Sequence, residues 1–246
     1  MKISATLITL NEEENLPRAL DSLRWCDEIV VLDSGSTDRT VEIAEQYGAR
    51  VLRRDFDGYA EQKNFIDEAA SHDWILSLDA DEALSDRLAD EIQQVKRTGP
   101  GYDGYRFPRK AQYMGKWIHH SGWYPDPKVR FYDRRKARWA GLVHESVSVD
   151  GTVGELGGDL LHYTCRSLAE HLHTIDRYTT LAAREMITQG KRAHLGNVLI
   201  SPPWAFLRTY FLKLGFLDGF EGLVIAAMAS FYVFSKYVKA MELSSR

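Results

Sequence analysis

Acidic side chains gather in the segment Leu78-Asp79-Ala80-Asp81-Glu82, directly after the apolar run 74–78. Carboxylate oxygens at the end of a buried strand can hold a hard divalent cation, and that cation can bridge a diphosphate. Magnesium commonly binds one or two carboxylates together with substrate phosphates, so a complete protein cage is unnecessary. The same spacing also occurs in a solvated turn before a helix, and the segment alone does not decide between the two.

A second acidic residue, Asp33, ends the apolar run 30–32. Its carboxylate could accept a hydrogen bond from the N–H of a pyrimidine base, and Gly35 allows the backbone to turn tightly or to approach a ligand. The following residues 36–38 (Ser-Thr-Asp) suit a helix N-terminus without any ligand, and we interpret them in that way. A capping side chain would lie nearer the helix than Asp33 does, so we favour a ligand contact for Asp33.

The elements that position these carboxylates follow from the apolar pattern. Asn11 and Ser36 are expected to cap the first two helices, and Gly48 to end the second. The alternation of strand and helix predicts a mainly parallel sheet with helices on both faces. Ligands of such sheets bind beyond the carboxyl ends of the strands, where the acidic residues stand. The expected strands are 3–10, 28–33, 49–53 and 74–78, and the expected helices are 12–23, 37–47, 59–70 and 85–97.

The pattern changes after Gly99. Three short strands are expected between loops rich in tryptophan and histidine, followed by a long helix over 167–189. Pro202-Pro203 is expected to break the chain, and a final helical region to run from about Trp204 to Leu243. The expected short strands are 105–109, 128–133 and 146–149.

The composition is that of a globular chain with a sizeable core, with 246 residues of which 44% are hydrophobic and 27% charged. A net charge of -4 gives no case for nucleic-acid binding. Residues 191–246 carry seven Lys or Arg against three Asp or Glu. This basic, aromatic tail favours an anionic surface as a partner, although basic residues could instead only solvate the last helices.

The cysteines and the N-terminus bear on the compartment. Cys26 and Cys165 are too few for a disulfide scaffold and lack zinc-ligand spacing. Residues 1–15 have no small-residue cleavage site and are interpreted as a first strand, not a signal peptide. The sequence therefore predicts a protein on the cytoplasmic side.

The first hundred residues resemble the family 2 glycosyltransferases, which have the GT-A fold. The matching segments are Thr9-Leu10-Asn11-Glu12, residues 33–38 and Asp79-Ala80-Asp81. The family usually has a second acid after Asp33, where this chain has Ser34, which leaves Asp33 as the base contact. The resemblance implies an α/β, Rossmann-like sheet and a Mg or Mn ion. The donor, a UDP-sugar, would be bound by Thr9, Asn11, Glu12, Asp33, Lys63, Asp79, Ala80 and Arg130.

Other segments are similar to the bacterial branch that builds lipopolysaccharide cores, which includes enzymes adding a β-1,4-linked glucose to a core heptose. The resemblance implies transfer of a hexose to such a core or to another lipid-linked glycan, and glucose is the expected hexose. We then expect a donor half over 1–100, an acceptor half over 101–200 and a helical, membrane-associated tail over 201–246. The similar segments are 61–64, 74–76, 128–131, 143–145 (Val-His-Glu) and 215–219.

The resemblance also implies an inverting transfer, which needs a base beside the acceptor hydroxyl. Glu145 is our candidate for that base, and Asp126 is the second choice. His162 is a candidate metal ligand beside Asp79 and Asp81, although a lone histidine on a strand is more often structural. Three tryptophans could stack on sugar rings or lie in the core; these are Trp117, Trp123 and Trp139.

The tail contains twelve uncharged residues from Leu223 to Phe234, fewer than the roughly 20 apolar residues of a spanning helix. We therefore expect it to lie on the inner face of the bacterial inner membrane, or else to pack on its own domain or on a second subunit.

Two other functions stay open. A nucleotidyltransferase would want a glycine-rich loop where 11–14 reads Asn-Glu-Glu-Glu. A non-catalytic glycan- or membrane-binding module with a relic donor site would be favoured by loss of the Asp79 and Asp81 pair, which is present.

Overall fold

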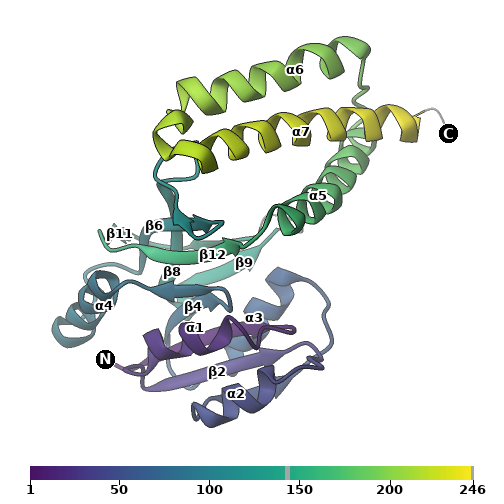
Figure 1. Ribbon diagram of the computed structural model, residues 1–246. Coiled ribbons are helices and arrows are strands. Elements are labelled where there is room, and N and C mark those ends of the chain that lie inside the picture. The colour runs from purple at the N-terminus through teal and green to yellow at the C-terminus, as the bar shows by residue number, and fades with distance from the viewer. Residues whose placement is uncertain (142–144, 245–246) are drawn as a thin grey trace. The chain divides into compact units, whose positions relative to one another are not determined.

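The computed structural model describes residues 1–141 and 145–244 (Figure 1), so Val143 and His144 of the expected 143–145 segment lie outside it. The chain divides into two compact units. Unit 1 comprises residues 1–109 and 126–163, and unit 2 comprises 110–125 and the chain from 164 onward. Two strands, β6 (Gly104–Tyr113) and β12 (Leu160–Cys165), begin in unit 1 and end in unit 2.

Unit 1 is built on a mixed sheet whose first four strands in spatial order are parallel. β1 (Ile3–Thr9) pairs with β2 (Glu28–Asp33) on one side and with β4 (Trp74–Asp79) on the other, while β3 (Arg50–Arg53) pairs with β2. β8 (Asp126–Asp133) then joins β4 antiparallel. The strand order is β3-β2-β1-β4-β8-β6-β12-β5, where β5 is Glu82–Leu84. The expected α/β, GT-A fold class is confirmed.

Register explains why the polar residues meet. Thr9 stands opposite Asp33, and Ile8 stands opposite Asp79. The carboxyl ends of β1, β2 and β4 therefore reach the same edge of the sheet, as the apolar pattern predicted. The strands themselves are buried because helices supply apolar side chains such as Leu16 and Leu20 to one core cluster. The helices of unit 1 are α1 (Leu16–Leu23), α2 (Thr40–Gln46), α3 (Tyr59–Ala69) and α4 (Asp86–Thr98).

The two predicted N-caps are wrong. Asn11 has a φ of 56°, in the left-handed region, and its Oδ1 accepts a hydrogen bond from the Thr37 N–H at 2.8 Å. Ser36 Oγ accepts from the Asn11 N–H at 2.9 Å, and the two helices begin later, at Leu16 and Thr40. The polar side chains tie the β1–α1 and β2–α2 loops to each other, and this cross-bonding fixes the loops at the edge of the sheet.

Several short strands had no sequence signal. Besides β5 and β12 they are β7 (Lys116–Trp117), β9 (Ala137–Ala140) and β11 (Val153–Glu155). Each is defined by its partner, since β7 and β11 pair with β6, and β9 pairs with β10 (Ser146–Val149) in a separate two-stranded sheet. Segments of two to four residues are too short for an alternating pattern to stand out.

Unit 2 is mainly helical, and α7 (Gly219–Ser244) packs against both α5 (Leu168–Thr188) and α6 (Leu195–Leu207), as Figure 1 shows. The predicted break at Pro202-Pro203 is wrong, because both prolines lie inside α6. A proline inside a helix loses one backbone hydrogen bond and crowds the carbonyl one turn earlier, yet α6 continues to Leu207. The expected helical region from about Trp204 to Leu243 consists of the end of α6, the π-helical η2 (Arg208–Leu212), the 3-10 turn η3 (Gly215–Asp218) and α7.

The turn before α7 is fixed by the buried side chain of Asp218. It accepts hydrogen bonds from the His119 and His120 N–H groups, both at 3.0 Å, and from Ser121 Oγ at 3.2 Å. The loop that carries Trp117 and Trp123 is therefore held by the tail within unit 2.

Candidate active site

Four charged side chains meet in unit 1. Lys63 Nζ lies 2.8 Å from Asp79 Oδ1 and 3.1 Å from Glu145 Oε1. Arg130 Nη2 lies 2.7 Å from Asp79 Oδ2. Lys63 and Arg130 are almost completely buried, with 1% and 4% of their surface exposed. The structure thus brings the predicted base and two predicted diphosphate-binding cations to the aspartate at the end of β4.

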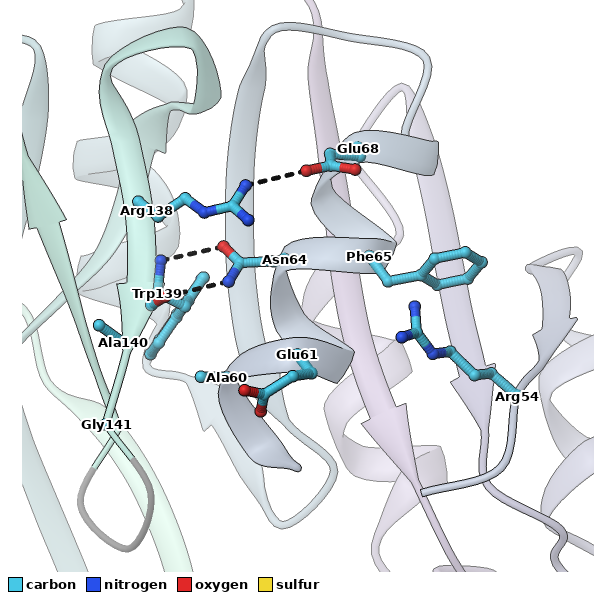
Figure 2. A pocket seen from close by; sticks show the side chains of 10 residues that line it. All are labelled: Arg54, Ala60, Glu61, Asn64, Phe65, Glu68, Arg138, Trp139, Ala140 and Gly141. Atoms are coloured by element: carbon cyan, nitrogen blue, oxygen red, sulfur yellow. Dashed lines mark hydrogen bonds and ion pairs between the residues drawn. The ribbon is translucent and has the colours of Figure 1, made fainter. Parts of the chain in front are cut away.

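α3 places Lys63 by turning a mixed apolar and charged face inward. Its buried positions include Ala60, Lys63, Ile66 and Asp67, spaced one helical turn apart. The next residue, Asn64, joins α3 to β9: its Nδ2 donates to the Trp139 carbonyl and its Oδ1 accepts from the Trp139 N–H, both at 3.0 Å (Figure 2). In the 61–64 segment, Lys63 therefore supplies a charge to the cluster, and Asn64 fixes α3 against β9.

Trp139 forms an aromatic wall beside the cations. The ring is 4% exposed, and its centroid lies 4.4 Å from Lys63 Nζ and 5.2 Å from Arg130 Cζ. A cation near an aromatic face is attracted by the ring quadrupole. Of the two predicted roles, burial in the core is therefore the one that the structure supports for Trp139.

A hollow of about 510 Å³ lies between α3 and β9, as Figure 2 shows. Among the residues of the charged cluster and its aromatic wall, only Trp139 lines it. Asn64, Phe65 and Arg138 contribute to its walls, and Arg138 is bound to Glu68 at 2.9 Å. The hollow is therefore distinct from the edge of the sheet where β2 ends at Asp33 and β4 ends at Asp79.

The charges of the cluster depend on one another. Burial alone would raise the pKa of Asp79, but Arg130 and Lys63 hold it far below its usual range. Burial alone would lower the pKa of Arg130, but Asp79 and Glu82 raise it above its ordinary value. Arg130 Nε is nevertheless buried without a hydrogen-bond partner among the described residues. One strong donor at the cluster is thus available to an anionic ligand.

The predicted metal ligands divide into two sets. His162 Nε2, on β12, lies 3.1 Å from Asp81 Oδ2, so these two candidates converge. Asp79 instead directs its two oxygens to Lys63 and Arg130. Within residues 1–141 and 145–244, no group of three or more His, Cys, Asp or Glu side chains is arranged as a metal site. An oxygen and a nitrogen ligand on the protein would fit a cation that takes its other ligands from a diphosphate.

The remaining predicted donor residues line the ends of the strands. Asp33 is 2% exposed and accepts hydrogen bonds from the Gly35 and Ser36 N–H groups, both at 3.0 Å, so it also fixes its own turn. Thr9 is buried, and its hydroxyl donates to the Leu32 carbonyl at 3.4 Å. Glu12 accepts from Asn15 Nδ2 at 2.8 Å. Ala80 is buried in the apolar core and offers no side-chain polar atom.

Sequence reasoning missed Arg109, and it named Glu82 only as part of the acidic segment 78–82. Glu82 is 1% exposed, and its oxygens bind the Asp79 N–H at 3.0 Å and Arg109 Nη1 at 3.2 Å. Arg109 also binds Asp126 at 2.7 Å, and this pairing helps to hold the pKa of Asp126 below its ordinary value against the effect of burial. Asp126 and Glu145 are thus both ion-paired, but only the partner of Glu145, Lys63, also binds Asp79.

A second buried acid, Asp67, lies one helical turn after Lys63. It accepts hydrogen bonds from Tyr132 Oη at 2.7 Å, Thr6 Oγ1 at 3.2 Å and Trp139 Nε1 at 3.2 Å. Burial raises the pKa of Asp67 to about 6, although these hydrogen bonds oppose the shift. Two charged residues four positions apart on the apolar face of a predicted helix were the signal that could have identified this network.

The chain is similar to known glycosyltransferases over the segments that form this site. The family model for Glycosyl transferase family 2 matches residues 4–148. The chain is similar to the lipopolysaccharide core biosynthesis glycosyltransferase LpsC of Rhizobium meliloti, with 31% identity over 98% of this chain and 93% of that one. It is also similar to an uncharacterized glycosyltransferase of Rickettsia typhi, with 32% identity over 99% and 88% of the two chains.

Among solved structures, a glucosyl-3-phosphoglycerate synthase of Mycobacterium tuberculosis matches 45% of this chain and 44% of its own, with 28% identity and a TM-score of 0.36. That crystal structure is a complex with Mn²⁺, UDP and glucosyl-3-phosphoglycerate.

Proposed function

Because the chain belongs to glycosyltransferase family 2, we propose that it transfers a hexose from a UDP-sugar to a hydroxyl of a lipopolysaccharide core or another lipid-linked glycan. Glucose is the hexose that we propose. In this proposal the transfer inverts the anomeric carbon. The observation that carries the proposal is the double contact of Lys63. This side chain binds Asp79, at the carboxyl end of β4, and Glu145, the candidate catalytic base.

The donor would lie over the carboxyl ends of β1, β2 and β4. There the buried Asp33 carboxylate would accept a hydrogen bond from the pyrimidine base of UDP. Thr9 and Asn11 lie next to Asp33. The cations Lys63 and Arg130 would neutralise diphosphate charge, and the unpartnered Arg130 Nε supports an anionic ligand at this place.

A Mg or Mn ion would be held by Asp81 and His162, which are already 3.1 Å apart. When bound, such a cation stabilises the negative charge that develops on the departing UDP. Asp79 would contribute as the carboxylate that keeps Lys63 and Arg130 in place, since both of its oxygens bind them.

Glu145 would take the proton of the acceptor hydroxyl. A carboxylate oxygen can accept such a proton, and the Lys63 ammonium lies 3.1 Å from Glu145 Oε1. Glu145 is partly accessible, with 19% of its side chain exposed.

A screen of UDP-hexoses tests this function directly. The full-length protein is incubated with each UDP-sugar, with Mn²⁺ or with EDTA, and mass spectrometry follows UDP release alone and in the presence of a lipopolysaccharide core acceptor. We expect metal-dependent release from one UDP-hexose, UDP-glucose first, and a mass gain of one hexose on the acceptor. A nucleotidyltransferase would produce UDP-sugar from UTP and sugar phosphate instead, and a non-catalytic module would release nothing; either result contradicts the proposal.

A further inference from the structure

Large apolar side chains are exposed along the last third of the chain. Ile200, Leu212 and Phe220 are 71%, 67% and 66% exposed, values typical of surface polar residues. Isolated exposed apolar residues are normal, but many of them on elements that pack against one another indicate an interaction surface, and α6, η2, η3 and α7 pack in this way. We call this group the tail face: Leu195, Leu199, Ile200, Trp204, Leu207, Phe211, Leu212, Leu214, Phe216, Leu217, Phe220, Leu223, Phe231, Phe234, Val238 and Met241.

The tail face follows helical spacing on both helices. Ile200, Trp204, Leu207 and Phe211 are separated by steps of four, three and four residues along α6 and its continuation. On α7, the residues from Phe231 to Met241 are separated by three, four and three. Such steps place side chains on one side of a helix. Each helix therefore presents an apolar stripe that its own unit leaves uncovered.

Basic residues are interleaved with the apolar ones. Arg208 follows Leu207, Lys213 stands between Leu212 and Leu214, and Lys191 and Arg192 precede α6. In the part of the chain that the structure describes, none of these four has an ion pair. Apolar and aromatic side chains with unpaired basic neighbours match the boundary of a bilayer that carries anionic headgroups.

Length alone would allow α7 to cross a membrane, since Gly215–Ser244 is long and apolar enough and only 22% of its most apolar window is buried. Its packing argues against crossing. Lys239 Nζ on α7 binds Asp176 Oδ1 of α5 at 2.7 Å and the Thr180 hydroxyl at 2.8 Å. α5 also carries charged side chains such as Glu185 and Arg184. A spanning α7 would draw this charged partner into hydrocarbon, where each charge is costly.

We propose that the tail face lies in the headgroup boundary of an anionic bilayer, with α6 and α7 parallel to the membrane plane and α5 on the aqueous side. A second copy of the chain is the competing occupant. In a twofold contact a residue meets its own copy only at the axis. Elsewhere, this face would set Arg208 and Lys213 against the apolar residues that define it, where unpaired charge is costly, and that cost favours lipid. The inference is independent of the proposed function, because bilayer binding requires neither donor nor acceptor.

Flotation of the full-length protein with vesicles provides the test. Vesicles of phosphatidylcholine with phosphatidylglycerol are compared at low and high salt with vesicles of phosphatidylcholine alone. We expect binding to the anionic vesicles, weakened by salt. The variant Ile200→Gln/Leu212→Gln/Phe220→Gln should lose at least about tenfold in partitioning. The matched control, Leu172→Gln/Leu181→Gln, changes two leucines of α5 that are each 39% exposed and should bind as the wild type does.

Depth and assembly complete the test. Trp204 fluorescence should be quenched by lipids brominated near the headgroup more than by lipids brominated near the chain ends; the reverse order would overturn the in-plane geometry. Absence of flotation with anionic vesicles would overturn the proposal. So would sedimentation equilibrium that shows a dimer which the triple variant converts to monomer, because the occupant would then be a second copy.

Discussion

Units 1 and 2 depart from the usual distribution of side chains in opposite ways. Unit 1 buries charge: Lys63 and Arg130 are 1% and 4% exposed around Asp79. Unit 2 exposes apolar surface, with Ile200 at 71%. A buried ion pair costs desolvation that its attraction seldom exceeds, and an exposed apolar face forgoes hydrophobic stabilisation. Neither arrangement is explained by stability, so each is better explained by what it binds.

The two regions differ in what supports them. The charged cluster is surrounded by partners in three elements, because α3, β4 and β8 each contribute one of its side chains. In the tail face, by contrast, exposed apolar side chains are interleaved with basic residues such as Arg208 and Lys213. A rigid cluster suits a small ligand whose charges must be met at fixed positions, whereas an open apolar face suits a fluid surface.

The largest effect is expected for Glu145→Gln. If Glu145 takes the acceptor proton, transfer should fall by about 10² to 10⁴-fold, while UDP affinity stays near that of the wild type. Steady-state transfer and calorimetric UDP binding measure the two effects. The matched control is Glu155→Gln, which changes an exposed acid on β11 and should leave transfer unchanged. Normal turnover of Glu145→Gln would move the base elsewhere in the cluster.

A second prediction concerns the effect of the buried Asp67 carboxyl on the free energy of unfolding. Its folded pKa of about 6 lies above its ordinary value of 3.8, so the native state binds more protons than the unfolded state between these values. The free energy of unfolding should therefore fall as pH rises through this window, by up to about 3 kcal/mol. Asp67→Asn should remove that part of the pH dependence.

Denaturant unfolding at pH 4 to 7 measures this difference. Asp90→Asn, which changes an exposed acid on α4, is the control and should retain the wild-type profile. If wild type and Asp67→Asn showed parallel profiles, the buried network would not hold the carboxyl as described.

A smaller effect is expected in the turn before α7. A Cβ at Gly222 would overlap the Gly215 carbonyl oxygen, which backbone cannot easily avoid. Gly222→Ala should therefore lower the stability of unit 2 by about 1–3 kcal/mol, as measured by thermal unfolding. Gly196→Ala in α6 meets no atom within 4 Å and should be neutral or slightly stabilising, because alanine favours helix. Equal stabilities of the two variants would show that the turn is not tightly packed.

Local pattern was enough to predict much of unit 1. The apolar runs ending at Asp33 and Asp79 indicated buried parallel strands, and register then brought both carboxylates to one edge. Asp81 and His162 could be proposed as metal ligands, since both residue types bind metal, but their 3.1 Å approach depends on the pairing of β12 with β5. Nothing in the spacing of residues 81 and 162 encodes that contact.

What the sequence did not reveal depends on distant partners. Glu82 is buried because Arg109 and Arg130 approach it from β6 and β8, and no pattern within residues 78–82 indicates those cations. Asn11 was interpreted as a cap because caps are the commonest local use of that side chain, yet its partner is Thr37 in another loop. The continuity of α6 through two prolines likewise contradicted a local rule.

We propose that Asp81 and His162, 3.1 Å apart, complete a metal-dependent UDP site. Titration calorimetry of UDP into the wild type, with Mn²⁺ or with EDTA, tests it most directly, with Asp81→Asn as the variant and Asp90→Asn as the control. The wild type and the control should bind UDP more tightly with Mn²⁺. Asp81→Asn should lose this metal-dependent gain while it keeps its fold by circular dichroism. Unchanged UDP affinity of Asp81→Asn in the presence of Mn²⁺ would contradict a metal site at Asp81.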